Sequence, residues 1–140
     1  MAGYETNLAS EFYILSVLHR LGVDATLTLG NKKSVDILVV RHAGDAVTVD
    51  VKGVAGKYDW PADNIRMTPN HRHFIAFVSY EGSFQDPTLL PSVWIVPYEE
   101  VAQFTKQYQG RKNVSRAVLT KNGESYRNAW HLLIEDTSTS

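Results

Sequence analysis

The hydrophobic positions of this chain follow a helical period in one region and an extended period in others. Residues 6–21 carry apolar side chains on one helical face and end at Gly22, which predicts a helix. The members of that face are Leu8, Ile14, Leu15, Leu18 and Leu21. Apolar alternation or continuous apolar runs predict strands at 23–29, 35–41, 45–52, 73–80 and 92–97. Further helices are predicted at 98–109, which Gly110 terminates, and at 124–134.

The order of these elements predicts a single α/β domain. One helix, three strands, two more strands and then helices describe a mixed central β-sheet flanked by helices, and not a repeated βαβ winding. A length of 140 residues fits one domain, 1–140, with its own core. The last residues, 135–140, are expected to form a frayed tail.

The composition excludes several classes of site and of protein. The sequence contains no cysteine, which removes disulfides, thiolate zinc sites and cysteine nucleophiles together. There is neither a leader-like N-terminus nor an apolar run of about 18 residues, so we expect a cytoplasmic protein without a membrane segment. A net charge of −1 disfavours a strongly basic DNA-coating protein, but it permits a nuclease that clusters acids at a metal site.

A carboxylate interrupts the apolar face of the first predicted helix. At about 100° per residue, Glu11 lies within about 20° of Leu18 and about 40° of Leu15. A carboxylate buried there is costly unless it is paired, hydrogen-bonded or bound to a metal. The alternative is that the apolar face ends early and that Glu11 reaches solvent or a nearby lysine.

The strands at 35–41 and 45–52 form a hairpin whose register follows from its turn. His42, Ala43 and Gly44 suit a three-residue loop, because that loop type requires a left-handed residue at its third position. In this register, two residues face each other across the hairpin when their numbers sum to 86.

This register predicts that two aspartates face each other. Asp36 pairs with Asp50, and like charges on directly opposed Cβ atoms, about 4.5 to 5.5 Å apart, repel. The strand period puts Lys52 on the face of Asp50. The other face carries Val47, Val49 and Val51. In the alternative interpretation, Lys52 neutralises Asp50 on a salt-bridged sheet surface, and Asp36 lies at a solvated strand end.

Considered together, the charged positions favour a cation. Oxygen ligands without cysteine or a histidine cluster suit a hard divalent ion such as Mg²⁺, for which Mn²⁺ could substitute. Such an ion keeps several waters and completes its coordination with phosphate oxygens of a substrate.

These residues carry a family resemblance. Glu11 on a first helix, Asp36 on a strand and Asp50, Val51 and Lys52 on the next strand resemble the PD-(D/E)xK nuclease superfamily. The match covers residues 8–53. This superfamily has the restriction-endonuclease-like fold and also contains Holliday-junction resolvases.

The chain departs from the family motif at two positions. Val35 stands where the motif has proline, and Asp50 stands where glutamate is commoner. The resemblance implies an αβββ then ββα-type core around a mixed sheet. The strand at 73–80 and the later helix are compatible with such a core.

The resemblance implies a metal-dependent endonuclease that hydrolyses phosphodiester bonds in DNA. Asp36 and Asp50 would bind the metal, with the backbone carbonyl of Val51 as a further ligand and Glu11 acting directly or through water. Lys52 beside carboxylates keeps its charge, so we favour stabilisation of the transition state and orientation of the water over proton abstraction.

A second set of residues flanks the predicted strands and could contact nucleic acid. Its members are Lys32, Lys33, Lys57, Trp60, Arg66, His71, Arg72 and His73. For each, a solvated turn or strand edge is the alternative, and a tryptophan next to Pro61 also suits a packed loop anchor. Trp94 and Trp130 are expected in the core.

Two other functions remain open from the sequence. One is a non-catalytic module that keeps the nuclease fold and binds nucleic acid or a protein partner. The other is an unrelated α/β domain with a coincidental motif. Duplex DNA, branched DNA and RNA are all candidate substrates, and symmetric cleavage of two strands would favour a homodimer.

Overall fold

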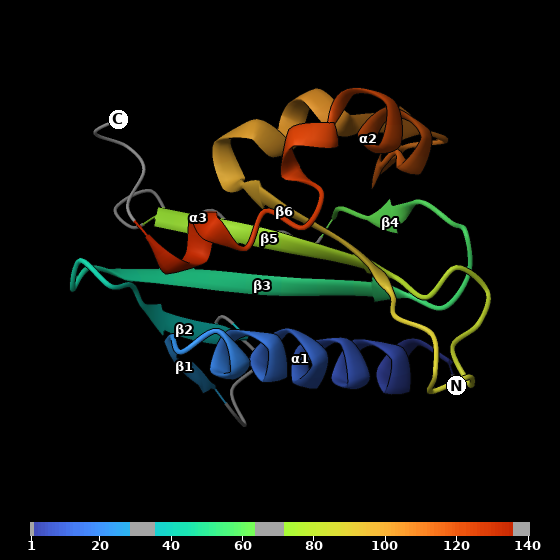
Figure 1. The fold of residues 1–140 in the computed structure, drawn as a ribbon. Coiled ribbons are helices and arrows are strands. Elements are labelled where there is room, and N and C mark those ends of the chain that lie inside the picture. Colours follow the sequence, from blue (N-terminus) through green and yellow to red (C-terminus); the bar gives the residue numbers. More distant parts are fainter. Residues whose placement is uncertain (1, 29–35, 64–71, 136–140) are drawn as a thin grey trace.

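The computed structural model describes residues 2–28, 36–63 and 72–135, which form a central sheet with helices on both faces (Figure 1). The central sheet has the strand order β1-β2-β3-β5-β6. Its strands are β1 (Asp24–Leu27), β2 (Ile37–Val40), β3 (Ala46–Val54), β5 (Arg72–Ser79) and β6 (Ser92–Pro97). β3 and β5 run parallel, and every other neighbouring pair is antiparallel. The predicted α/β class with a mixed sheet is therefore confirmed.

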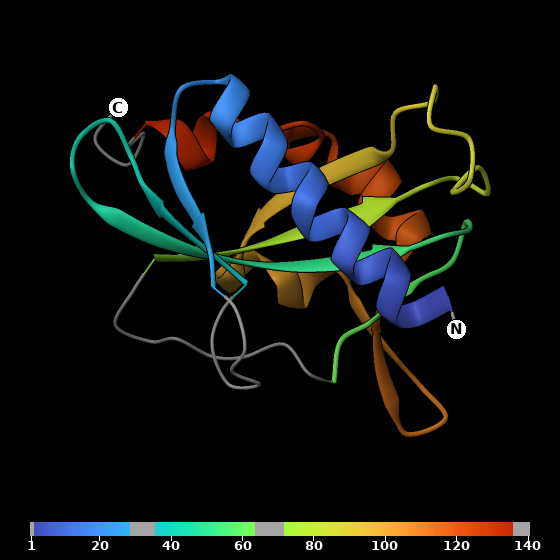
Figure 2. The ribbon, with the colours of Figure 1, turned by 90° about the horizontal axis from the view of Figure 1, so that it is seen from below.

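One face of the sheet is covered by the helix α1 (Ala2–Arg20), which lies along β3 in Figures 1 and 2. Ile14 and Leu18 of this helix are fully buried, as its apolar period predicts. They pack against the inward side chains of β2 and β3, and Leu133 joins them from the C-terminal helix α3 (His131–Ile134). Burial of this face is what fixes α1 on the sheet.

The other face carries a second core beneath a smaller, three-stranded sheet. That sheet has the order β4-β8-β7, and it is joined by a 3₁₀ helix η1 and by α2. These elements are β4 (Trp60–Pro61), η1 (Tyr98–Phe104), β7 (Thr105–Tyr108), β8 (Arg111–Val114) and α2 (Arg116–Asn122). Trp60, Trp94, Phe77 and Phe104 are the largest buried side chains in this core, and all four are almost fully buried.

The region after β6 differs from the sequence-based expectation. The predicted helix at 98–109 is a 3₁₀ helix only as far as Phe104, after which the chain turns into a hairpin. Gly110 does not end a helix: with φ of +79° it forms the hairpin turn together with Gln109. The predicted helix at 124–134 is also divided, into the 3₁₀ helix η2 (Glu124–Tyr126) and the short α3.

None of the described helices combines the length and the apolar composition that a membrane crossing requires.

Candidate functional site

The β2–β3 hairpin has the register that its turn predicts. Gly44 has φ of +96°, and the Arg41 N–H donates to the Asp45 carbonyl across a loop of three residues. Ile37 pairs with Val49, and Asp36 lies one position beyond this last pair, on a bend. Asp50 and Lys52 are on the face opposite the buried valines of β3, as expected.

Beyond Asp36, no strand among the described residues pairs with β3 on its β2 side, and polar side chains accept its N–H groups there. The backbone N–H of Val51 donates to Asp36 Oδ2 at 2.7 Å. The next outward N–H, that of Gly53, donates to Asn7 Oδ1 of α1 at 2.9 Å. An edge that would otherwise present unpaired N–H groups is therefore occupied by one carboxylate and one amide.

α1 approaches β3 closely at Gly53. A Cβ atom at this glycine would collide with the Ser10 hydroxyl and would stand 3.2 Å from the Thr6 carbonyl oxygen. The Ser10 hydroxyl is buried and donates to that same carbonyl at 2.6 Å. Small residues on α1 and on β3 thus bring the two backbones together, and Glu11 lies one helical turn after Asn7, beside this contact.

Glu11 shows that the charged positions lie within electrostatic reach of one another. Its pKa is raised to about 7 by burial, and the negative charges of Asp36 and Asp50 add to this rise while Lys52 opposes it. The interpretation in which Glu11 simply reaches solvent is not supported, because desolvation is the largest cause of its shift. One helix and two strands therefore contribute four charged groups to one region.

Asp50 has a histidine as its partner. Its carboxylate is mostly buried, and Oδ2 lies 3.4 Å from Nε2 of His73 on the neighbouring β5. The other ring nitrogen of His73, Nδ1, shares a hydrogen bond of 2.7 Å with the Thr48 hydroxyl. His73 Nε2 is buried and, among the described residues, has no hydrogen-bond partner, so its approach to Asp50 is a close contact and not a hydrogen bond.

Lys52 does not neutralise Asp50. Within residues 2–28, 36–63 and 72–135, its ammonium group forms no ion pair with a carboxylate. Its side chain is half-buried on the same face as Asp50, next to Phe77 of β5. The salt-bridged sheet surface considered from the sequence is therefore absent at this pair of residues.

The donor set fits a hard cation, although three metal ligands are not assembled. In the described part of the chain no group of three His, Asp or Glu side chains is arranged to hold a metal ion. Mg²⁺ commonly needs only one or two carboxylates, because waters and substrate phosphates supply the remaining ligands. Asp36 and Asp50 offer oxygen donors of this kind, and the repulsion felt by Glu11 is a reason for a cation to bind here.

Comparison with solved structures relates this architecture to an endonuclease. The chain has the fold of a bacterial homing endonuclease, I-Ssp6803I, with a TM-score of 0.55. The two sequences are 18% identical, and the likeness covers 92% of this chain and 88% of that one. At this identity the comparison establishes a shared fold. No protein-family model matches the sequence, and no curated protein is significantly similar to it.

The residues predicted to contact nucleic acid fall into three groups: those outside the described residues, those that are exposed and those that are buried. Lys32, Lys33, Arg66 and His71 lie outside the described residues. Lys57 and Arg72 are exposed. Trp60 and His73 are buried, so in this structure neither side chain is exposed for a direct contact with nucleic acid. The Trp60 indole instead donates to the Val78 carbonyl at 3.1 Å, which makes it the packed anchor given as the alternative.

Sequence reasoning missed two supports of the site. His73 was considered only as a surface contact, because its pairing with Asp50 depends on the parallel β3–β5 register. Asn7 and its bond to Gly53 were not considered, although a glycine directly after the Asp50-Val51-Lys52 segment is a signal for close backbone approach.

Proposed function

We propose that this protein is a metal-dependent endonuclease that hydrolyses phosphodiester bonds in DNA. The observation that carries the proposal is the grouping of Glu11, Asp36, Asp50 and Lys52, expressed in the raised pKa of Glu11. Their order on a helix and a hairpin resembles the PD-(D/E)xK motif, which supports the proposal. The fold shared with a homing endonuclease supports the same reaction class.

The proposed metal ligands lie at the edge of β3 where polar side chains accept the backbone N–H groups. Asp36 and Asp50 would hold Mg²⁺, with the Val51 carbonyl and Glu11 as further candidates. When bound, such an ion polarises the scissile phosphate and lowers the pKa of a bound water. The Val51 N–H orients the Asp36 carboxylate by a hydrogen bond, and the His73 ring lies 3.4 Å from the carboxylate of Asp50.

Lys52 supplies positive charge on the face that carries Asp50. Because no carboxylate of the described residues is paired with its ammonium group, the charge would be available to the oxygens of a phosphate in the transition state. This role requires the lysine to remain protonated, and it needs no proton transfer.

A cleavage panel with Asp50→Asn tests this function. The panel contains supercoiled, linear, single-stranded and branched DNA together with RNA, each with Mg²⁺ and with Mn²⁺. We expect the wild type to cut DNA, and Asp50→Asn and Lys52→Ala to lower the rate by at least about 10²-fold. Asp24→Asn, on the same sheet but exposed, is the matched control and should cut like the wild type.

Equal cleavage by the wild type and Asp50→Asn would exclude these carboxylates as the site. Calorimetry adds a measurement that is independent of turnover: Mg²⁺ or Mn²⁺ should bind the wild type and fail to bind Asp50→Asn. If the protein bound DNA but neither metal binding nor cleavage depended on Asp50, the non-catalytic module would be the better description.

A further inference from the structure

The β7–β8 hairpin is an exposed, basic, two-stranded ribbon. Tyr108 pairs with Arg111 and Gln107 with Lys112, and these four side chains are all exposed. The whole stretch from 101 to 115 contains three basic residues and no acidic one, in a chain whose net charge is −1. The ribbon projects from the body of the protein, as Figure 2 shows.

The cations occupy both faces of this ribbon. Lys106 and Tyr108 alternate along β7, so they share one face with Arg111, while Lys112 lies on the other. A ribbon that is charged on both faces is suited to a position between two rows of phosphates. A flat surface patch would instead be charged on one side only.

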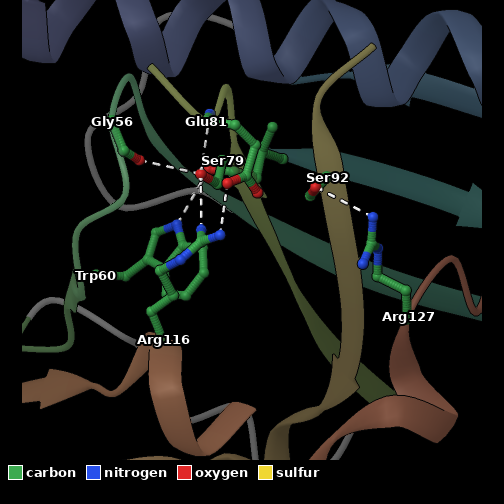
Figure 3. A network of polar contacts seen from close by, with 8 residues as sticks. Gly56, Trp60, Ser79, Glu81, Ser92, Arg116 and Arg127 are labelled. Atoms are coloured by element: carbon green, nitrogen blue, oxygen red, sulfur yellow. Dashed lines mark hydrogen bonds and ion pairs between the residues drawn. The ribbon is translucent and has the colours of Figure 1, made fainter. Parts of the chain in front are cut away.

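The base of the ribbon is rigidly attached to the protein. Phe104 and Val114, which flank it, are buried in the second core, and β4 pairs with β8 at this point. Two residues later the Arg116 guanidinium donates to Ser79 and Glu81 at the end of β5 (Figure 3). The backbone N–H of Arg116 donates to Asp59. The tip is therefore solvated while the base is held from several sides.

An open cavity lies between the ribbon and the segment that begins at Tyr98. It has a volume of about 390 Å³, and Tyr98, Glu99, Lys106 and Lys112 are among its lining residues. The Tyr98 ring stands 6.0 Å from the ring of His73, the partner of Asp50. Glu99 is the acidic member of the lining, and the two lysines outnumber it.

We propose that the β7–β8 hairpin enters the major groove of duplex DNA, where Lys106, Arg111 and Lys112 contact the phosphates and base edges. A two-stranded β-ribbon fits the major groove of B-form DNA, and Arg and Lys are the side chains that bind phosphates and guanine there. The deep, narrow major groove of an RNA duplex does not admit such a ribbon. This inference rests on the proposed function, from which it takes DNA as the substrate. It adds the structural element that binds the DNA.

The test measures binding without cleavage. A fluorescently labelled DNA duplex is titrated in EDTA with the wild type and with a Lys106→Ala/Arg111→Ala double variant. We expect the variant to bind about tenfold more weakly at about 50 mM salt. Because two phosphate contacts are lost, its slope of log K against log salt should be shallower by about 1.8.

A charge-matched control removes two exposed cations elsewhere. Arg20→Ala/Lys121→Ala lowers the net charge equally but leaves the ribbon intact, and it should bind with at least most of the wild-type affinity and salt slope. Thermal unfolding of both double variants should match the wild type, since all four side chains are exposed.

The outcomes separate this inference from the proposed function. Any of three results would overturn the contact between the ribbon and DNA. These are equal losses of affinity in both double variants, unchanged binding in the ribbon variant, and no duplex binding by the wild type. Ribbon-dependent binding of an RNA duplex as tight as that of DNA would overturn the groove assignment. Ribbon-dependent duplex binding by a protein that cuts nothing would retain this inference and reject the endonuclease.

Discussion

The two hairpins of this protein have similar backbones and opposite surroundings. β2–β3 is embedded in the central sheet, where buried valines fix one face and Asp36 and Asp50 are brought together near the other. In the described part of the chain, β7–β8 is held at its base and by backbone contacts of Lys112 with Ala62 and Asp63, and it exposes its cations to solvent. A two-stranded hairpin therefore groups charged side chains within the sheet at β2–β3 and exposes them to solvent at β7–β8.

The difference lies in what burial does to each charge. At the embedded hairpin, partial burial and nearby carboxylates raise the pKa of Glu11, so the local charges are coupled. At the free hairpin the cations are surrounded by water, which screens them from each other. Substitutions should therefore change stability at the first hairpin and affinity at the second.

Gly53→Ala should produce the largest loss of stability, because it separates α1 from β3. The new Cβ meets the buried Ser10 hydroxyl and the Thr6 backbone, and neither can move without displacing the helix. We expect a loss of about 3 kcal/mol in the free energy of unfolding, measured with urea.

Gly56→Ala is the matched control for this substitution. Its new Cβ meets only the ring of Tyr58, which is exposed and can rotate away. A loss at Gly56 as large as that at Gly53 would mean that close approach of α1 is not the cause.

Substitution of Asp36 by Asn and by Ala separates its structural role from its charge. Both variants remove the repulsion with Glu11, but asparagine keeps an oxygen that can accept the Val51 N–H. We expect Asp36→Ala to be about 1–2 kcal/mol less stable than Asp36→Asn in urea unfolding, with cleavage lost in both. Cleavage retained by Asp36→Asn would exclude this carboxylate as a metal ligand.

Stability should respond to pH through Glu11. Its folded pKa of about 7 lies above the ordinary value of 4.5, so its contribution is fully present below 4.5 and is lost as the pH rises through 7. Glu11→Gln, which has no charge to lose, should exceed the wild type by about 1 kcal/mol at pH 8 in EDTA, after allowance for solvent screening.

The gain of Glu11→Gln should disappear well below pH 4.5, where the wild-type carboxyl is protonated in both states. Urea unfolding at the two pH values provides the comparison, and exposed Glu124→Gln is the control that should show no such pH dependence. A gain of the same size at both pH values would attribute the effect to packing.

Gln109→Asn should have the smallest effect, at the turn of the free hairpin. Gln109 and Gly110 both have positive φ, and an Asn-Gly pair is the sequence that such two-residue turns favour. We expect a gain of about 0.5 kcal/mol in thermal unfolding without a change in duplex affinity. A weaker affinity would mean that the Gln109 side chain itself contacts the DNA.

The sequence predicted the embedded hairpin because its local signals agree. Gly44 sets the turn, alternating valines set the buried face, and the observed register of Ile37 against Val49 follows from the two together. The first helix was predicted for a similar reason, since Ile14 and Leu18 repeat at the helical period. Strong local patterns were sufficient for these elements.

The free hairpin was missed because its signals are ambiguous. Its strands are polar on both faces, so they lack the alternation that marks a half-buried strand. Val101 and Phe104 are spaced three apart, which suits an α-helix and a 3₁₀ helix equally, and Gly110 suits a helix end as well as a turn. The partnership of His73 with Asp50 depends on a long-range parallel pairing, which no local pattern encodes.

Arg116 has a geometric consequence for any DNA held by the ribbon. Its guanidinium group ties the segment after β8 to Ser79 and Glu81 at the end of β5, and β5 is the direct neighbour of the strand that carries Asp50. If both proposals hold, these contacts keep the ribbon at a fixed position relative to the carboxylates. The number of base pairs between the groove that holds the ribbon and the phosphate that is cut would therefore be constant.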